Sequence, residues 1–395
     1  MFENLSHLAL QQYWWIIISV LAALLVFLMF VQGGQTLIYK LGKTGLERTI
    51  LINTLGRKWE FTFTTLVTFG GAFFASFPLF YATSFGGAYW VWMLILFAFV
   101  IQAVSFEFRS KAGNFLGQKT YEGFLFVNGL LGTILIGTAV ATFFTGSPFI
   151  LSQNISTSGE ILMINQVEWQ TPFRGLELAF NFGRYFTFVN LSLGFAVFFL
   201  ARVLAILYFM NAVDEENINQ RAKTQLLRNA LPFLAFFLFF LANLLLMDGY
   251  AVNPETKEIY AEANKYLHNL LEMPAVLVIF LLGVAAVLLG IIRPLVAYEQ
   301  CHNKGIWLGG IGTILTVFAL FLVAGFNNTA FYPSYIDPQS SLTIENASSS
   351  KYTLTAMSYV SLMIPFVLAY IWYAWRAISN KKITAGEMEE DTHIY

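Results

Sequence analysis

Two glutamates stand at matching positions in a predicted transmembrane hairpin. Glu60 precedes an apolar run at 61–81, and Glu107 follows a second run at 88–106. Each run is about 20 residues long, enough to cross roughly 30 Å of hydrocarbon. Because each residue rises about 1.5 Å, equal distances from the turn at 82–87 place both carboxyl groups near the same membrane face. Such acids are candidates for a proton or ion path, although helix ends and partner contacts also carry acids.

Other charged residues in or near the predicted spans are candidates for a functional or structural role because of where they lie. Glu107 and Lys111 are spaced i, i+4, which predicts an ion pair on one helix face, and Arg109 lies between them. Arg202 falls inside a span, where it needs a carboxylate, carbonyls or a lipid phosphate unless it snorkels. Asp248 ends another span, and its position fits a helix-end residue better than a proton donor.

The histidines argue against a haem held by this chain. His7, His268, His302 and His393 all fall in connections or tails. A membrane protein that binds its own haem usually holds the iron with histidines that project from helices into the bundle. We therefore expect this chain to bind no haem and no metal. The single cysteine, Cys301, excludes an intrachain disulfide.

Composition indicates a polytopic membrane protein. Of 395 residues, 57% are hydrophobic and 11% charged, against about 25% charged in soluble domains. The net charge of −1 offers no basic surface for nucleic acid. We predict an all-α fold with about nine transmembrane helices, the first a retained span rather than a signal peptide. The runs are 13–38, 61–81, 88–106, 123–144, 186–210, 230–247, 274–292, 306–326 and 355–378.

Basic residues are distributed unequally between the two sides. Sixteen of the 22 lie in alternate connections, beginning with the first, and in the C-terminal tail, whereas five lie in the other connections. Because cytoplasmic loops carry the excess of Lys and Arg, we expect the N-terminus outside and the C-terminus in the cytoplasm. This topology puts Glu60, Glu107 and Lys111 on the cytoplasmic side.

Three long connections divide the predicted single membrane domain. We expect two four-helix bundles plus a final helix. The loop at 327–354 is rich in Asn, Ser, Thr and Pro, which predicts an irregular surface loop. The predicted parts are 1–145 (first four-helix group), 146–185 (outer loop), 186–326 (second group), 327–354 (outer loop) and 355–395 (ninth helix and tail).

Several segments, taken in order, resemble subunit II of the cytochrome bd quinol oxidases, the subunit without haem. The resemblance covers essentially the whole chain. The matching segments are Glu47–Asn53 with Trp59-Glu60, Gly70–Pro78, Phe106–Lys111, Arg221–Gln225, Asp248–Tyr250, Asn346–Ser348 with Tyr352–Leu354, and Thr392–Tyr395.

The resemblance implies a role in a respiratory complex of the bacterial inner membrane. The partner, subunit I, would hold the b- and d-type haems, oxidise quinol and reduce oxygen to water. This chain would stabilise subunit I and help lead cytoplasmic protons to the oxygen site. Small accessory subunits, and a structural quinone or lipid in this chain, are left open. The implied proton path comprises Glu60, Glu107, Lys111 and Tyr395. Structural or partner contacts are expected at Trp59, Arg109, Arg202 and Asp248.

The chain departs from the family pattern at three places. Many relatives have aspartates with glycines at the end of the first span, where this chain has Phe30–Gln35. Some have an arginine where Gln102 stands, and a tryptophan is replaced by Thr65. The resemblance therefore does not imply a charged pocket, a quinone pocket or an oxygen route at these positions.

Two other functions remain open. A stand-alone secondary transporter would use Glu60, Glu107 and Arg202, and would need a discontinuous helix pair near the midplane, of which the sequence shows no clear sign. In a purely structural scaffold, the acids would mark helix ends.

Overall fold

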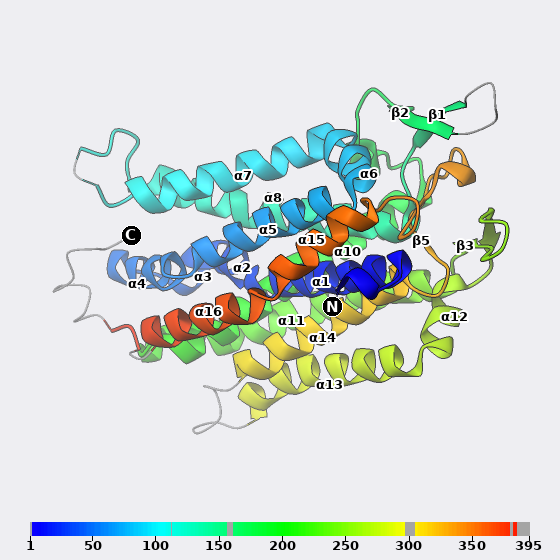
Figure 1. Cartoon of the computed structure of the whole chain (residues 1–395). Helices are drawn as coiled ribbons and strands as arrows, with labels where there is room; N and C mark the ends of the chain where they lie inside the picture. The colour runs from blue at the N-terminus through cyan, green and yellow to red at the C-terminus, as the bar shows by residue number, and fades with distance from the viewer. Residues whose placement is uncertain (1, 112, 156–160, 297–304, 380–381, 385–395) are drawn as a thin grey trace.

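The computed structural model describes residues 2–111, 113–155, 161–296, 305–379 and 382–384. The fold is mostly helical (74%), as predicted. Long helices run side by side, and three small hairpins gather at one end (Figure 1). The long helices are α1 (His7–Leu28), continued by α2 (Phe30–Gln35), α5 (Trp59–Ser76), α7 (Tyr89–Phe108), α8 (Gln118–Thr145), α10 (Tyr185–Ala212), α11 (Glu216–Leu246), α13 (Pro274–Val296) and α14 (Gly305–Gly325).

Shorter helices connect or extend these spans. They are α3 (Ile38–Leu41), α4 (Gly45–Gly56), α6 (Pro78–Phe80), the π-helical turn Tyr81–Gly86, α9 (Glu177–Phe180), α12 (Lys265–Glu272), α15 (Lys351–Ser361) and α16 (Ile364–Ile378). The start of α4 is fixed by a capping box, in which the Thr44 hydroxyl accepts from the Glu47 amide and the Glu47 carboxylate accepts from the Thr44 amide.

The described residues contain seven helices that are long and apolar enough to cross a membrane, and nine spans if two bent pairs are counted. The first pair, Gly45–Ser76 and Pro78–Gly86, is bent by 117°. The second, Lys351–Ser361 and Ile364–Ile378, is bent by 40°. Pro78 and Pro365 lie in the first turns after these bends, and proline removes a donor from the helix ladder. Every predicted run is largely helical, and the count of nine stays a prediction.

Glycines let several helices approach closely. A Cβ on Gly33 would lie 2.1 Å from the backbone carbon of Ala201, so α2 and α10 meet backbone to backbone. Gly283 and Gly312 give α13 and α14 the same kind of contact. Gly71, by contrast, has nothing near it. Close packing therefore explains some of the glycines within spans and not others.

One end of the bundle carries the three sheets, and we call it the hairpin end (residues 147–155, 161–175, 249–262 and 330–343). They are β1 (Phe149–Ile155) with β2 (Ile161–Trp169), β3 (Gly249–Val252) with β4 (Ile259–Glu262), and β5 (Ala330–Tyr332) with β6 (Leu342–Thr343), all antiparallel. We call the opposite end the basic end (residues 39–58, 109–111, 113–119 and 213–223) (Figure 1). The predicted grouping of connections is thus present, while the side that faces the cytoplasm stays a prediction.

The loop at 327–354 is largely irregular, as its composition predicted, but it does not lie only on the surface. Phe331 and Tyr332 are buried and pack against Phe80 and Phe143. The polar residues form turns inside the loop: Asn346, for example, accepts from the Thr343 amide and donates to a backbone carbonyl. The composition revealed the turns and gave no sign that two aromatic residues anchor them in the core.

Candidate functional site

Glu60 and Glu107 lie at neighbouring helix ends at the basic end. Glu60 is in the first turn of α5, and Glu107 is near the end of α7. The rings of Trp59 and Phe106 stack between these helices, with centroids 5.9 Å apart and planes at 14°. Both glutamates are exposed, and Lys111 pairs with Glu107 at 3.4 Å, which confirms the predicted ion pair. Tyr395 lies outside the described residues.

The two glutamates lie at the edge of a broad apolar surface. On α5, the exposed positions include Val67 and Phe74, seven and fourteen residues from Glu60. On α7, Phe97, Val100 and Val104 are exposed and lead towards Glu107. Aromatic contacts hold these helices together, including Phe63 with Phe99 at 6.1 Å. The acids and their lysine therefore lie at the rim of a surface of α5 and α7 that is open in this chain.

Arg109 points inward, away from Glu107. Its guanidinium donates to Glu122 at 2.8 Å, and both side chains are 3% exposed. The Tyr39 hydroxyl donates to the other oxygen of Glu122 at 2.5 Å, and Arg48 lies 3.7 Å from it. Arg109 also donates to Thr49 at 3.3 Å. This buried cluster joins α3 and α4 to α7 and α8. The contact expected at Arg109 is therefore a structural contact within this chain.

Sequence reasoning missed Glu122. A signal was available, because Glu122 immediately precedes the apolar run at 123–144 as Glu60 precedes its own run. Spacing along the chain could not show that Arg109, thirteen residues earlier, would turn towards it.

A neutral polar cluster lies further inside the bundle. Gln32 donates to Gln102 at 3.3 Å, so the segment Phe30–Gln35 and Gln102, the two places inside the bundle where the chain departs from the family pattern, meet. Gln35 and Asn128 are buried as well, and their side-chain amides have no hydrogen-bond partner among the described residues. Buried amides of this kind usually bind water. Gln102 and Arg109 are seven residues apart and share the inward side of α7.

Arg202 and Asp248 lie apart from the two exposed glutamates. The Arg202 guanidinium sits over the Phe198 ring at 5.3 Å, and its buried Nε has no hydrogen-bond partner within the described part of the chain. Asp248 is exposed, just beyond α11. Neither is in an ion pair within the described ranges. They do not form one site with Glu60 and Glu107.

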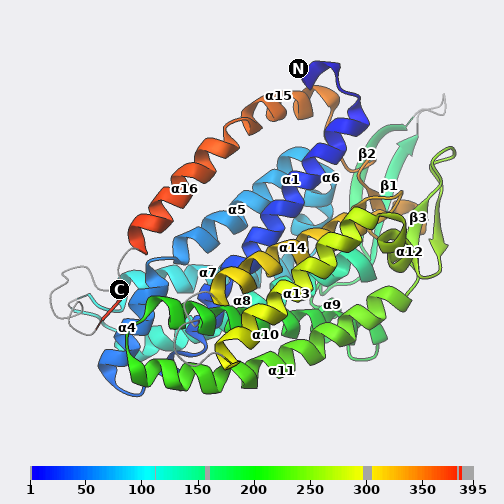
Figure 2. The same cartoon turned by 90° about the horizontal axis from the view of Figure 1, so that it is seen from below.

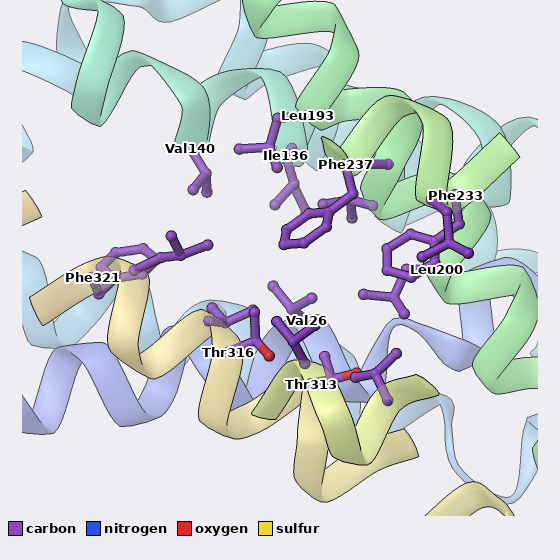
Figure 3. Close-up of a pocket in the computed structure, with 18 of the residues that line it drawn as sticks. Val26, Ile136, Val140, Leu193, Leu200, Phe233, Phe237, Thr313, Thr316 and Phe321 are labelled. Carbon is purple, nitrogen blue, oxygen red and sulfur yellow. The ribbon is translucent and has the colours of Figure 1, made fainter. Parts of the chain in front are cut away.

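An apolar cavity of about 80 Å³ lies between α1, α8, α10, α11, α13 and α14 (Figure 3). Among the described residues that line it, the polar side chains are Thr313 and Thr316. Their hydroxyls donate to the carbonyls of Gly309 and Gly312 at 2.8 Å each. No side-chain donor of this lining is left for a quinone carbonyl, so the cavity suits a hydrocarbon chain and does not fit a quinone ring.

No group of three or more His, Cys, Asp or Glu residues that could hold a metal is present in the described ranges. Helices that can span a membrane, with a buried ion pair and exposed acids at one end, define the class: a helical, multi-pass membrane protein. A family model described as cytochrome bd terminal oxidase subunit II matches residues 10–378. The chain therefore belongs to the cytochrome bd terminal oxidase subunit II family, as its motifs indicated.

Individual relatives agree with this family. Cytochrome bd-I ubiquinol oxidase subunit 2 of Escherichia coli (strain K12) is 28% identical, over 98% of this chain and 99% of the relative. Probable cytochrome oxidase subunit 2 of Haemophilus influenzae is 27% identical, over 96% and 97%. The fold is similar to that of bd oxidase from Geobacillus thermodenitrificans, with a TM-score of 0.59 and 14% identity over 94% of this chain and 98% of that chain. Family membership implies a part in a quinol oxidase complex.

Proposed function

We propose that this chain is the haem-free subunit of an electrogenic bd-type quinol:oxygen oxidoreductase in a bacterial inner membrane. It stabilises the haem-bearing subunit I, which carries the b- and d-type haems and the quinol site, and it contributes to the cytoplasmic proton path. The observation that carries the proposal is the placement of Glu60, Glu107 and Lys111 at the rim of an exposed apolar surface.

An exposed apolar surface that ends in acids suits a partner subunit within the membrane. The partner would cover Val67, Phe97 and Val104, while Glu60 and Glu107 would remain at its aqueous edge. A carboxylate at such an edge can take protons from water and pass them on over hydrogen-bond distances. We place subunit I on this face for that reason.

The complex is tested by purifying the tagged protein in mild detergent from its native membrane. A dithionite-reduced minus air-oxidised spectrum is then recorded. We expect a co-purifying partner with b- and d-type haem bands, and loss of these bands when the partner is stripped away. A colourless preparation without a partner would contradict the oxidase function and would favour the transporter that uses Glu60, Glu107 and Arg202, which the family match does not support.

The proton path is tested by replacing Glu107 with Leu. We expect oxygen consumption to fall by about tenfold or more, because positioned proton-transfer groups typically contribute that much or more, while the haem bands and complex assembly stay unchanged. Glu216→Leu is the matched control, since Glu216 is an exposed acid of the basic end on α11. Normal turnover in both the Glu60→Leu and Glu107→Leu variants would instead favour a purely structural scaffold.

A further inference from the structure

The last helix is held against the bundle at its two ends and not between them. The Tyr13 hydroxyl shares a hydrogen bond of 2.7 Å with Ser361, just before α16. Near the other end, the Trp375 ring contacts those of Phe61 and Trp307. Residues 362–370 are all exposed. Because consecutive residues point to every side of a helix, no face of this stretch packs on the bundle (Figure 2).

The neighbouring surfaces of α1 and α14 are apolar. Val20 is 39% exposed on α1, and Ile311 is 54% exposed on α14. Val20 is seven residues from Phe27, and Ile311 is four from Trp307, so each shares a helix side with a residue of a cavity at the basic end. From Ser361 to Trp375 the helix rises about 21 Å, more than one leaflet of a hydrocarbon core that is about 30 Å thick.

The cavity at the basic end is lined with cations and tryptophans. Its volume is about 40 Å³. Lining residues that matter here are Arg57, Asn211, Trp307, Trp375, Ser379 and Lys382. Basic pockets between helices bind anionic lipid head groups, and tryptophans favour the membrane surface. The cavity therefore offers cations that can bind a lipid head group and tryptophans that favour the membrane surface. It lies at the end of the apolar surface of α1 and α14.

Lys58 adds positive charge behind this cavity. Its side chain is 1% exposed, its Nζ lies 4.0 Å from the centre of the Trp375 ring, and it donates to the Ser379 hydroxyl at 3.1 Å. No carboxylate pairs with Lys58 among the residues that the structure describes. Lys382 has Asp214 at 3.7 Å, in an exposed pair that is weak in water. An anion at the cavity would compensate the buried charge.

We propose that an anionic phospholipid of the phosphatidylglycerol type binds between α16 and the surface of α1 and α14. Its phosphate occupies the cavity beside Arg57 and Lys382, and an acyl chain follows Trp307, Ile311 and Val20. The lipid fastens α16 to the bundle. A partner subunit or second copy of the chain could cover the apolar surface, but the positive cavity selects an anionic head group. Among the described residues, the lipid site shares none with the proposed proton path of Glu60, Glu107 and Lys111.

The test measures lipid retained by the purified complex. The complex is equilibrated with equal amounts of phosphatidylglycerol and phosphatidylcholine, washed with detergent, and analysed by lipid mass spectrometry. We expect selective retention of phosphatidylglycerol. Arg57→Gln with Lys382→Gln should lower its affinity about 30-fold, since each basic side chain at a membrane surface contributes about fivefold.

Two matched variants serve as controls. Lys119→Gln with Arg228→Gln removes two exposed cations of the same end on α8 and α11, and Arg57→Lys with Lys382→Arg keeps the charge. Both should retain the lipid. Equal retention of the two lipids by the unaltered complex, or unchanged retention in the Gln pair, would overturn the proposal.

A second measurement does not depend on any variant. A photoactivatable phosphatidylglycerol added to the unaltered complex should cross-link to peptides of α14 and α16. Cross-links confined to other helices would contradict the site.

Discussion

Breaking the ion pair between Arg109 and Glu122 is expected to destabilise the protein. Both side chains are 3% exposed, and Glu122 also accepts from the Tyr39 hydroxyl. Glu122→Ala leaves the Arg109 guanidinium buried without its carboxylate, which typically costs about 3–5 kcal/mol. The thermal unfolding midpoint of the detergent-solubilised complex should therefore fall clearly.

The exposed pair of the same helix end is the control. In Glu107–Lys111 both side chains are 60% exposed, so Glu107→Gln should change stability by less than about 1 kcal/mol. Arg109→Met with Glu122→Leu should recover much of the loss, because apolar replacement of a buried pair is often well tolerated. If Glu122→Ala and Glu107→Gln had equal effects, the buried cluster would have no special structural role.

At the scale of single residues, sequence spacing predicts contacts along one helix and not between helices. The pairing of Glu107 with Lys111 follows from an i, i+4 spacing and is confirmed. The meetings of Arg109 with Glu122 and of Gln32 with Gln102 depend on which sides of α2, α7 and α8 face each other. The helices are apolar on most sides, so their sequences carry little information about rotation.

Helix packing depends on Gly33, where α2 meets α10. A methyl group there would collide with the Ala201 backbone, which cannot move as a side chain can. Gly33→Ala should therefore destabilise the complex by about 1–3 kcal/mol, as overpacking usually does. Gly123→Ala is the matched control, since no atom lies within 4 Å of its added Cβ and its helix, α8, is not part of the surface of α5 and α7 on which we place subunit I. A thermal midpoint that falls equally in both variants would rule out this account of Gly33.

The β3–β4 hairpin and α12 are joined by a cluster that depends on pH. Burial alone would raise the pKa of Glu262, but hydrogen bonds from His268 and Lys265 outweigh it and lower that pKa below its usual value. A lowered pKa in the folded state means that the carboxylate stabilises the protein above the unfolded pKa of about 4.3. This contribution is lost as the pH falls through the lower, folded value.

Comparing the unaltered protein with Glu262→Gln measures this contribution. The unaltered protein should unfold at a higher temperature near pH 6, and the difference should shrink below about pH 4. Glu258→Gln, which removes an exposed acid of the same hairpin, is the matched control. A difference that stays constant or grows as the pH falls would contradict the assigned cause.

The helical elements were predicted from the sequence, whereas their bends and the burial of their connections were not. Runs of about 20 apolar residues predict spans because the bilayer sets that length. The bend of 117° near Pro78 was missed because the residues on both sides are equally apolar and read as one run, although the proline itself was a signal. Phe331 and Tyr332 were hidden for a different reason: their burial depends on a contact with Phe80 and Phe143, far away in the sequence.

At the scale of the whole molecule, charge decides the orientation in the membrane. The two groups of connections lie at opposite ends of the bundle (Figure 1), and the excess of basic residues should hold one end in the cytoplasm. Single cysteines test this in a Cys301→Ser background. Glu255→Cys in the β3–β4 turn and Lys119→Cys in the first turn of α8 are exposed positions at the two ends.

A membrane-impermeant maleimide should label Glu255→Cys in intact cells and Lys119→Cys after the inner membrane is opened. Labelling in the reverse order would invert the topology and would place Glu60, Glu107 and Lys111 outside. The proton path would then have to start from the other side of the membrane. Oxygen consumption of each cysteine variant is measured alongside, so that the labelled chain is known to be in its assembled form.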